Sequence, residues 1–174
     1  MDDSRRSRQE AMAQTRRDLV LRAVRQAVAE GGVANANVRD IARRAGYTAG
    51  ALYAYFPGKQ ALFEAVLTDS LARAHSAAKA KSAKVGRSAA DAALSLRAQA
   101  WFAYFLAHPA EAHLLLHVLS SDGRGLGQVG SGLASLLMES LGPVTQALQD
   151  TGCPEHLLQR ETMALLSMAM GLSL

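Results

Sequence analysis

The chain has 174 residues, of which 49% are hydrophobic and 20% are charged, and its net charge is +4. This length and composition fit one or two globular domains and exclude long disorder and collagen-like repeats. A single cysteine, Cys153, excludes an internal disulfide and fits a cytoplasmic protein. No apolar run is long enough to cross a bilayer, and the first residues, MDDSRRSRQE, lack the apolar core of a secretory signal.

The charge is unevenly distributed along the chain. Residues 1–60 contain 11 of the 19 basic side chains but only 6 of the 15 acidic ones, whereas residues 61–174 are close to neutral. A basic first part before a near-neutral apolar part predicts that the first part binds a polyanion.

Ala and Leu dominate the chain and only four prolines occur, so helix is the expected structure throughout. We expect a flexible basic tail over residues 1–14, then a helix that Thr15 caps and the Gly31-Gly32 pair ends. Asn37 and Thr48 are the expected caps of two short helices, which cover Val38 to Ala45 and residues up to about Tyr55.

Longer helices are expected in the second part of the chain. Their expected ranges are 59–83, 88–107, a helix from Pro109, 133–148 with an interruption at Gly142-Pro143, and a last helix from Pro154 to Leu174. Residues 121–132 are glycine-rich and predict a loop and a weak helix start.

The two short helices have the pattern of a helix-turn-helix unit. Ala42 is small where the helices cross, and Gly46 stands where the turn between them needs a left-handed backbone. Ile41, Leu52 and Tyr55 are the expected buried positions.

The start of the second short helix is suited to close approach to DNA. Thr48, Ala49, Gly50 and Ala51 are small, so the backbone can enter the major groove. Tyr53, Lys59 and Arg39 are candidate phosphate contacts, with Arg43 and Arg44 as further candidates. The alternative is that small residues merely start a helix well and that the arginines form a solvated face.

The segment VRDIARRAGYTAGALYAYFPGKQALFEAV, with the long helix before it, resembles the DNA-binding domain of TetR-type transcriptional regulators. The resemblance implies an all-α dimer, with a three-helix helix-turn-helix domain over residues 15–60 and a larger effector-binding and dimerisation domain over 61–174. It also implies that Asn37 caps its helix and can touch phosphate, that Thr48 to Ala51 face bases, and that Tyr53 and Lys59 touch phosphates.

The second part has one aromatic cluster, within a single expected helix. Trp101, Tyr104 and Phe105 suit the wall of a pocket for a hydrophobic or cationic effector, with core packing as an equally weighted alternative. His113, His117 and Met138 are further candidate lining residues. A metal site at the two histidines is disfavoured because three or four converging ligands are needed, and no cofactor is expected.

The last helix is apolar over more than one stripe, which predicts burial against a second subunit. The candidate interface residues are Leu158, Leu165, Met168 and Leu172. In the family that this chain resembles, the two C-terminal helices form the dimer seam, and this chain ends early for that arrangement.

Together these features predict a repressor that a small hydrophobic or cationic effector releases from a palindromic operator. A helical small-molecule enzyme is the first alternative, but the sequence contains neither GxSxG nor HExxH. The second alternative, a non-specific DNA-binding protein, would need cations spread over both parts of the chain.

Overall fold

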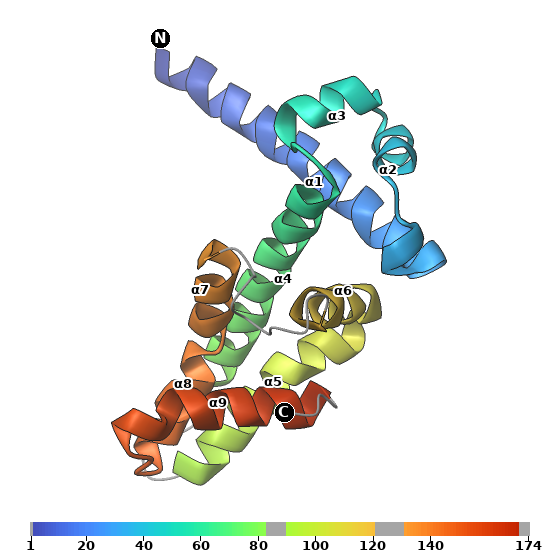
Figure 1. Cartoon of the computed structure of the whole chain (residues 1–174). Helices are drawn as coiled ribbons and strands as arrows, with labels where there is room; N and C mark the ends of the chain where they lie inside the picture. The colour runs from blue at the N-terminus through green and yellow to red at the C-terminus, as the bar shows by residue number, and fades with distance from the viewer. Residues whose placement is uncertain (1, 83–89, 121–130, 171–174) are drawn as a thin grey trace. The chain divides into compact units, whose positions relative to one another are not determined.

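The computed structural model describes residues 2–82, 90–120 and 131–170, and they form helices without a strand among them (Figure 1). The helices are α1 (Asp2–Asn35), α2 (Val38–Ala45), α3 (Ala49–Tyr55), α4 (Lys59–Ser82), α5 (Ala90–Ala107), α6 (Pro109–Ser120), α7 (Ser131–Ser140), α8 (Gly142–Asp150) and α9 (Glu155–Met170). The all-α class is therefore confirmed. None of the described helices has the length and apolar character needed to cross a membrane.

Helix α1 is longer than the sequence predicted. It begins at Asp2 instead of following a tail over residues 1–14, and Thr15 is not its cap. The Thr15 hydroxyl instead donates to the carbonyl of Ala11 at 2.8 Å, one turn back inside the helix. The early residues are mainly Arg, Gln, Glu, Ala and Met, which are strong helix formers, and this explains the extension. Gly32, with φ of 75°, interrupts the helix where the glycine pair predicted its end.

Both predicted caps of the short helices are confirmed. The Asp40 N–H donates to the Asn37 side chain at 2.8 Å, and the Ala51 N–H donates to the Thr48 hydroxyl at 3.2 Å. Each cap satisfies a backbone donor that the first helical turn leaves free. Thr48 therefore fixes the start of α3, the expected recognition helix.

The turn between α2 and α3 has the left-handed residue that the sequence predicted. Gly46 has φ of 78° and ψ of 26°, and the next N–H, that of Tyr47, donates to the Ala42 carbonyl at 2.8 Å. Ala42 is 1% exposed, in agreement with its place at the helix crossing. In Figure 1, α2 and α3 follow one another along one side of α1.

The chain divides into two compact units, residues 1–66 and 67–174. The division falls between Val66 and Leu67, inside α4, rather than at residue 60. The first turns of α4 supply buried side chains to the first unit, which explains the later boundary. The core of the first unit includes Val20, Leu21, Val24, Val28, Ile41, Leu52, Phe56, Leu62 and Phe63.

One core assignment was wrong: Tyr55 is 65% exposed, and Phe56, at 8% exposed, occupies the core position instead. Phe56 follows Leu52 by four residues, and its N–H donates to the Leu52 carbonyl at 2.9 Å, so the helical turn carries it to the same face. The exposed Tyr55 hydroxyl avoids the cost of burying a polar group.

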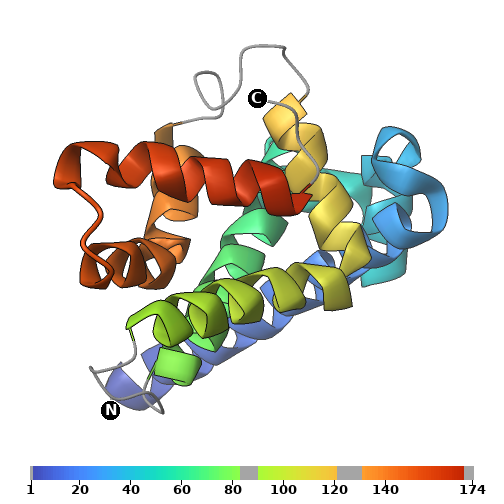
Figure 2. The same ribbon diagram turned by 90° about the horizontal axis from the view of Figure 1, so that it is seen from below.

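In the second unit, α5 packs against α6 and α8, and α8 packs against α7 and α9 (Figure 2). Trp101 and Phe105 of α5 are buried at its centre, with their ring centroids 4.7 Å apart. A ring nitrogen of His75 lies 2.9 Å from the Glu139 carbonyl and links α4 to α7. The predicted interruption at Gly142-Pro143 is confirmed, since α7 ends at Ser140 and α8 begins at Gly142. The expected loop residues 121–130 lie outside the described residues.

The left-handed turn leads to a stability prediction. Replacing Gly46 with Ala places a Cβ on a positive φ and is expected to lower the free energy of unfolding by about 1 kcal/mol. The control is Gly50→Ala in α3, where a Cβ meets nothing within 4 Å and the backbone is helical, so no loss of stability is expected. Urea denaturation followed by circular dichroism measures both, and equal losses would contradict the argument.

Candidate nucleic-acid interface

The start of α3 presents small side chains at the surface of the first unit. Thr48 and Gly50 are exposed, while Ala49 and Ala51 are half-buried. A Cβ added at Gly50 would meet open space, so no protein atom covers this part of the helix. The surface is therefore free for a groove to approach the backbone closely, as a recognition helix requires.

Four predicted phosphate contacts share one open hollow beside α3. Asn37, Arg39, Tyr53 and Lys59 all line it, although they come from three different helices and a cap. Tyr53 is 51% exposed and Arg39 is exposed. The fold thus brings two cations, a phenol and an amide to one place, which is the donor set that phosphate oxygens accept from.

Lys59 is held in position before any ligand arrives. Its ammonium donates to the Ala34 carbonyl at 3.1 Å and lies 5.3 Å from the centroid of the Phe63 ring. Lys59 is also the first residue of α4, where free N–H groups and the helix dipole favour an anion. These contacts hold the positive charge of Lys59 at the hollow and restrict the conformations of its long side chain.

Two other predicted cations are neutralised within the unit. The Arg44 guanidinium lies 2.5 Å from Asp40 and 2.7 Å from Glu30, and Arg43 lies 2.7 Å from Asp40. These ion pairs lower the pKa of Asp40, Arg43 contributing most and Arg44 next. Arg44 therefore connects α2 to α1 rather than projecting a free charge. The spacing of Asp40 from both arginines within α2 would have signalled part of this network, but nothing local signals Glu30.

The aromatic residues of α5 are not equivalent. Trp101 and Phe105 are buried core residues, and the Trp101 indole N–H donates to the Ser140 hydroxyl at 3.3 Å. Tyr104 is half-buried, and its hydroxyl donates to a carboxylate oxygen of Glu111 at 2.7 Å. Burial first, and then Glu111, raise the pKa of Tyr104, so its hydroxyl stays a hydrogen-bond donor.

Glu111 is a buried residue whose pairing with Tyr104 the sequence did not predict. It is only 3% exposed and lies in the first turn of α6, where the helix dipole favours a carboxylate. Its partner Tyr104 lies on the preceding helix, α5. Because a new helix begins at Pro109, between the two residues, the periodicity of a single helix does not predict this contact. His113 and His117 are exposed and Met138 is half-buried. No group of three potential metal ligands occurs in the parts of the chain that the structure covers.

The candidate interface residues of α9 also differ in exposure. Leu158 is 6% exposed within one chain, so it belongs to the packing of α9 on α8 rather than to a free surface. Buried Leu158, Thr162 and Leu166 recur every fourth residue and form a single stripe. Leu165 is half-buried and Met168 is 79% exposed, whereas Leu172 lies outside the described residues.

The Asp40 network predicts a pH dependence of stability. Because the folded-state pKa of Asp40 lies below its ordinary value of 3.8, the network stabilises the fold above that value. This contribution is lost as the pH falls through the lowered pKa. We expect Asp40→Asn to flatten the fall in melting temperature between roughly pH 5 and pH 2. Glu10→Gln, which removes an exposed carboxylate on α1 that is not part of the network, is the control for the loss of one negative charge, and equal flattening in both variants would contradict the argument.

Comparison with known proteins identifies the domain that carries this surface. Residues 20–66 match the sequence profile of the bacterial regulatory proteins of the tetR family. No curated protein matches the sequence.

Several solved structures share the fold of the chain at low sequence identity. The fatty acid degradation regulator FadR from Bacillus halodurans is 17% identical, with a TM-score of 0.69 over 89% of this chain and 80% of that chain. A protein of unknown function from Rhodococcus sp. RHA1 is 20% identical, with a TM-score of 0.70 over 90% and 79%. The TetR family transcriptional regulator PfmR from Thermus thermophilus is 19% identical, with a TM-score of 0.61 over 86% and 81%.

The matched segment covers the α1 core face, the capped α2, the Gly46 turn, α3 and the start of α4. Residues 20–66 therefore form a DNA-binding domain of the kind found in bacterial regulatory proteins of the tetR family.

Proposed function

We propose that this protein is a ligand-responsive repressor that binds a palindromic operator as a homodimer and leaves it when an effector binds. The recognition helix is α3, with Thr48, Ala49, Gly50 and Ala51 at the base edges. The backbone contacts are Asn37, Arg39, Tyr53 and Lys59.

The observation that carries this proposal is that, among the described residues, carboxylates neutralise some cations of the domain and leave others unpaired. Within the described residues, Arg39 and Lys59 at the hollow have no carboxylate partner, whereas Arg43 and Arg44 do. These unpaired charges lie beside the exposed, capped start of α3, and such an arrangement is suited to binding a phosphate backbone. An exposed face with only structural charge pairs would have no such preference.

The palindrome and the homodimer follow from the geometry of reading two half-sites. Two copies of α3 must lie about 34–36 Å apart to enter successive major grooves on one side of a duplex. The strongly exposed Met168 on α9, together with half-buried Leu165, supports an interface on this helix. Burial of such side chains in a dimer removes apolar surface from water.

The effector is proposed to bind in the second unit near α5 and α6. Buried Glu111, held by half-buried Tyr104, supplies a negative centre beside the Tyr104 ring, which lies 5.3 Å from the ring of Phe105. An effector with a cationic group and an apolar body would pair with both features. By linkage, the effector lowers the affinity for the operator by the same factor by which it binds the DNA-free protein more tightly than the DNA-bound protein.

Lys59→Ala tests the phosphate hollow directly. We expect it to weaken binding to every duplex alike, by about tenfold, and to reduce the slope of affinity against salt by about one. Lys79→Ala is the matched control, since it removes an exposed lysine from the same helix, outside the DNA-binding domain. Fluorescence anisotropy at several salt concentrations, with operator and random duplexes, measures both quantities.

Thr48→Ala and Ala51→Ser provide the complementary measurement in the same assay. They are expected to change the ranking of duplex sequences, obtained by selection from a random pool, while leaving the salt slope unchanged. If selection enriches no sequence at all, binding is non-specific and the repressor proposal fails.

Met168→Glu tests the proposed dimer surface. A charge at this exposed apolar position is expected to shift the monomer–dimer equilibrium by at least about tenfold toward monomer, because a buried, unpaired carboxylate is costly. Gln159→Glu adds the same charge at another exposed position of α9 and is the control. Sedimentation velocity across protein concentrations measures both, and a dimer that both variants retain would place the interface elsewhere.

A further inference from the structure

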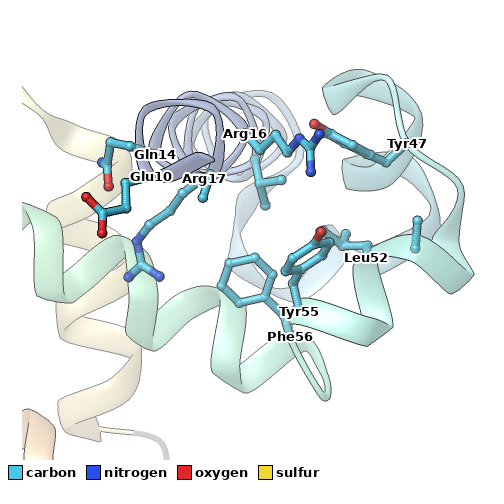
Figure 3. A pocket seen from close by; sticks show the side chains of 11 residues that line it. Glu10, Gln14, Arg16, Arg17, Tyr47, Leu52, Tyr55 and Phe56 are labelled. Carbon is cyan, nitrogen blue, oxygen red and sulfur yellow. The ribbon is translucent and has the colours of Figure 1, made fainter. Parts of the chain in front are cut away.

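The first unit contains a cavity that the DNA-binding surface does not explain. It has a volume of about 450 Å³ and lies between the first half of α1 and α3 (Figure 3). Cavities that bind small molecules have volumes of roughly 300–1,000 Å³, so this one is large enough for a ligand of two fused rings. Its walls are mainly apolar, with Leu52, Tyr55 and Phe56 from α3 and its cap facing Val20 of α1.

The polar groups of the cavity are separated into two ends. Figure 3 shows Arg16 pointing toward Tyr47 at one end, whereas Glu10, Gln14 and Arg17 lie at the other. Within the described residues neither Arg16 nor Arg17 has an ion-pair partner, in contrast to Arg44. An anion would therefore be received beside Arg16 and Tyr47, away from the Glu10 carboxylate.

We propose that this cavity binds a small aromatic carboxylate. Arg16 offers a planar fork of N–H donors that matches a carboxylate, and the Tyr47 hydroxyl offers another donor beside it. The rings of Tyr55 and Phe56 provide the surface on which an aromatic body stacks. The exposure of Tyr55, which the sequence did not predict, follows from its place in this wall.

Such a ligand would act on the recognition helix directly. Ala51 lines the cavity and is also one of the residues proposed to face bases, so an occupant would contact α3 next to the DNA surface. This step rests on the proposed function. The ligand and the operator would then oppose each other's binding by the same factor.

The site is tested first without DNA, by calorimetric titration of the full chain with 2-naphthoate. One saturable site per chain is expected. Arg16→Gln is expected to weaken it by about tenfold, the loss of a hydrogen bond to a charged group. Arg22→Gln is the matched control, because Arg22 is also exposed on α1 but does not line the cavity. Because both side chains are exposed, neither substitution is expected to change the stability of the fold. Melting curves that match the curve of the native chain will verify that both variants are folded.

Two further measurements separate this site from binding elsewhere. Ala13→Trp fills the cavity from an exposed position on α1 and is expected to abolish binding without changing the charge. The neutral amide 2-naphthamide has the same shape and is expected to bind about tenfold more weakly. Unsaturable binding to the native chain, or native affinity in both Arg16→Gln and Ala13→Trp, would overturn the site.

The DNA step has its own readout. With a selected operator duplex, saturating 2-naphthoate is expected to lower the operator affinity of the native chain but not that of Ala13→Trp. If 2-naphthoate binds the native chain but leaves its operator affinity unchanged, the proposal that ligand and operator compete is wrong. A chain that binds naphthoate at this site but no duplex would refute the proposed function and leave the site standing, whereas operator binding without naphthoate binding would refute only the site.

Discussion

The close crossing of α2 and α3 is the constraint on which the DNA-binding domain depends. Ala42 is small enough for the helices to approach, and Gly46 provides a backbone conformation that side chains with a Cβ resist. With that turn fixed, the hydrogen bond from Tyr47 to Ala42 and the Thr48 cap set the direction of α3. The positions of Ala51 and Tyr53 at the surface follow from this direction rather than from any contact of their own.

Carboxylates decide which basic residues remain available to a polyanion. A count of charges treats all cations of the first 60 residues alike, but Glu30 and Asp40 neutralise Arg44 and tie α2 to α1. Lys59 is restrained differently, by a neutral carbonyl and a ring, which orient its charge without cancelling it. The positive charge that remains available to a polyanion therefore includes Arg39 and Lys59 at the hollow, and not Arg44.

Local signals in the sequence were sufficient for most of the helices, because caps and turn glycines act within a few residues. The Asn37 and Thr48 caps, the Gly46 turn and the Gly142-Pro143 interruption are of this kind. Contacts between separate elements were not predictable in this way. The pairing of Tyr104 with Glu111 and the meeting of α1 and α3 around a cavity depend on tertiary packing, which spacing along one helix does not encode.

The distribution of aromatic residues gives each compact unit its own optical signal. Trp101, the only tryptophan of the chain, is fully buried in the second unit, so indole emission reports on the packing around Ser140 there. Three of the four tyrosines, Tyr47, Tyr53 and Tyr55, belong to the first unit and surround its recognition helix. Unfolding of the two units can therefore be followed separately in the unlabelled native protein.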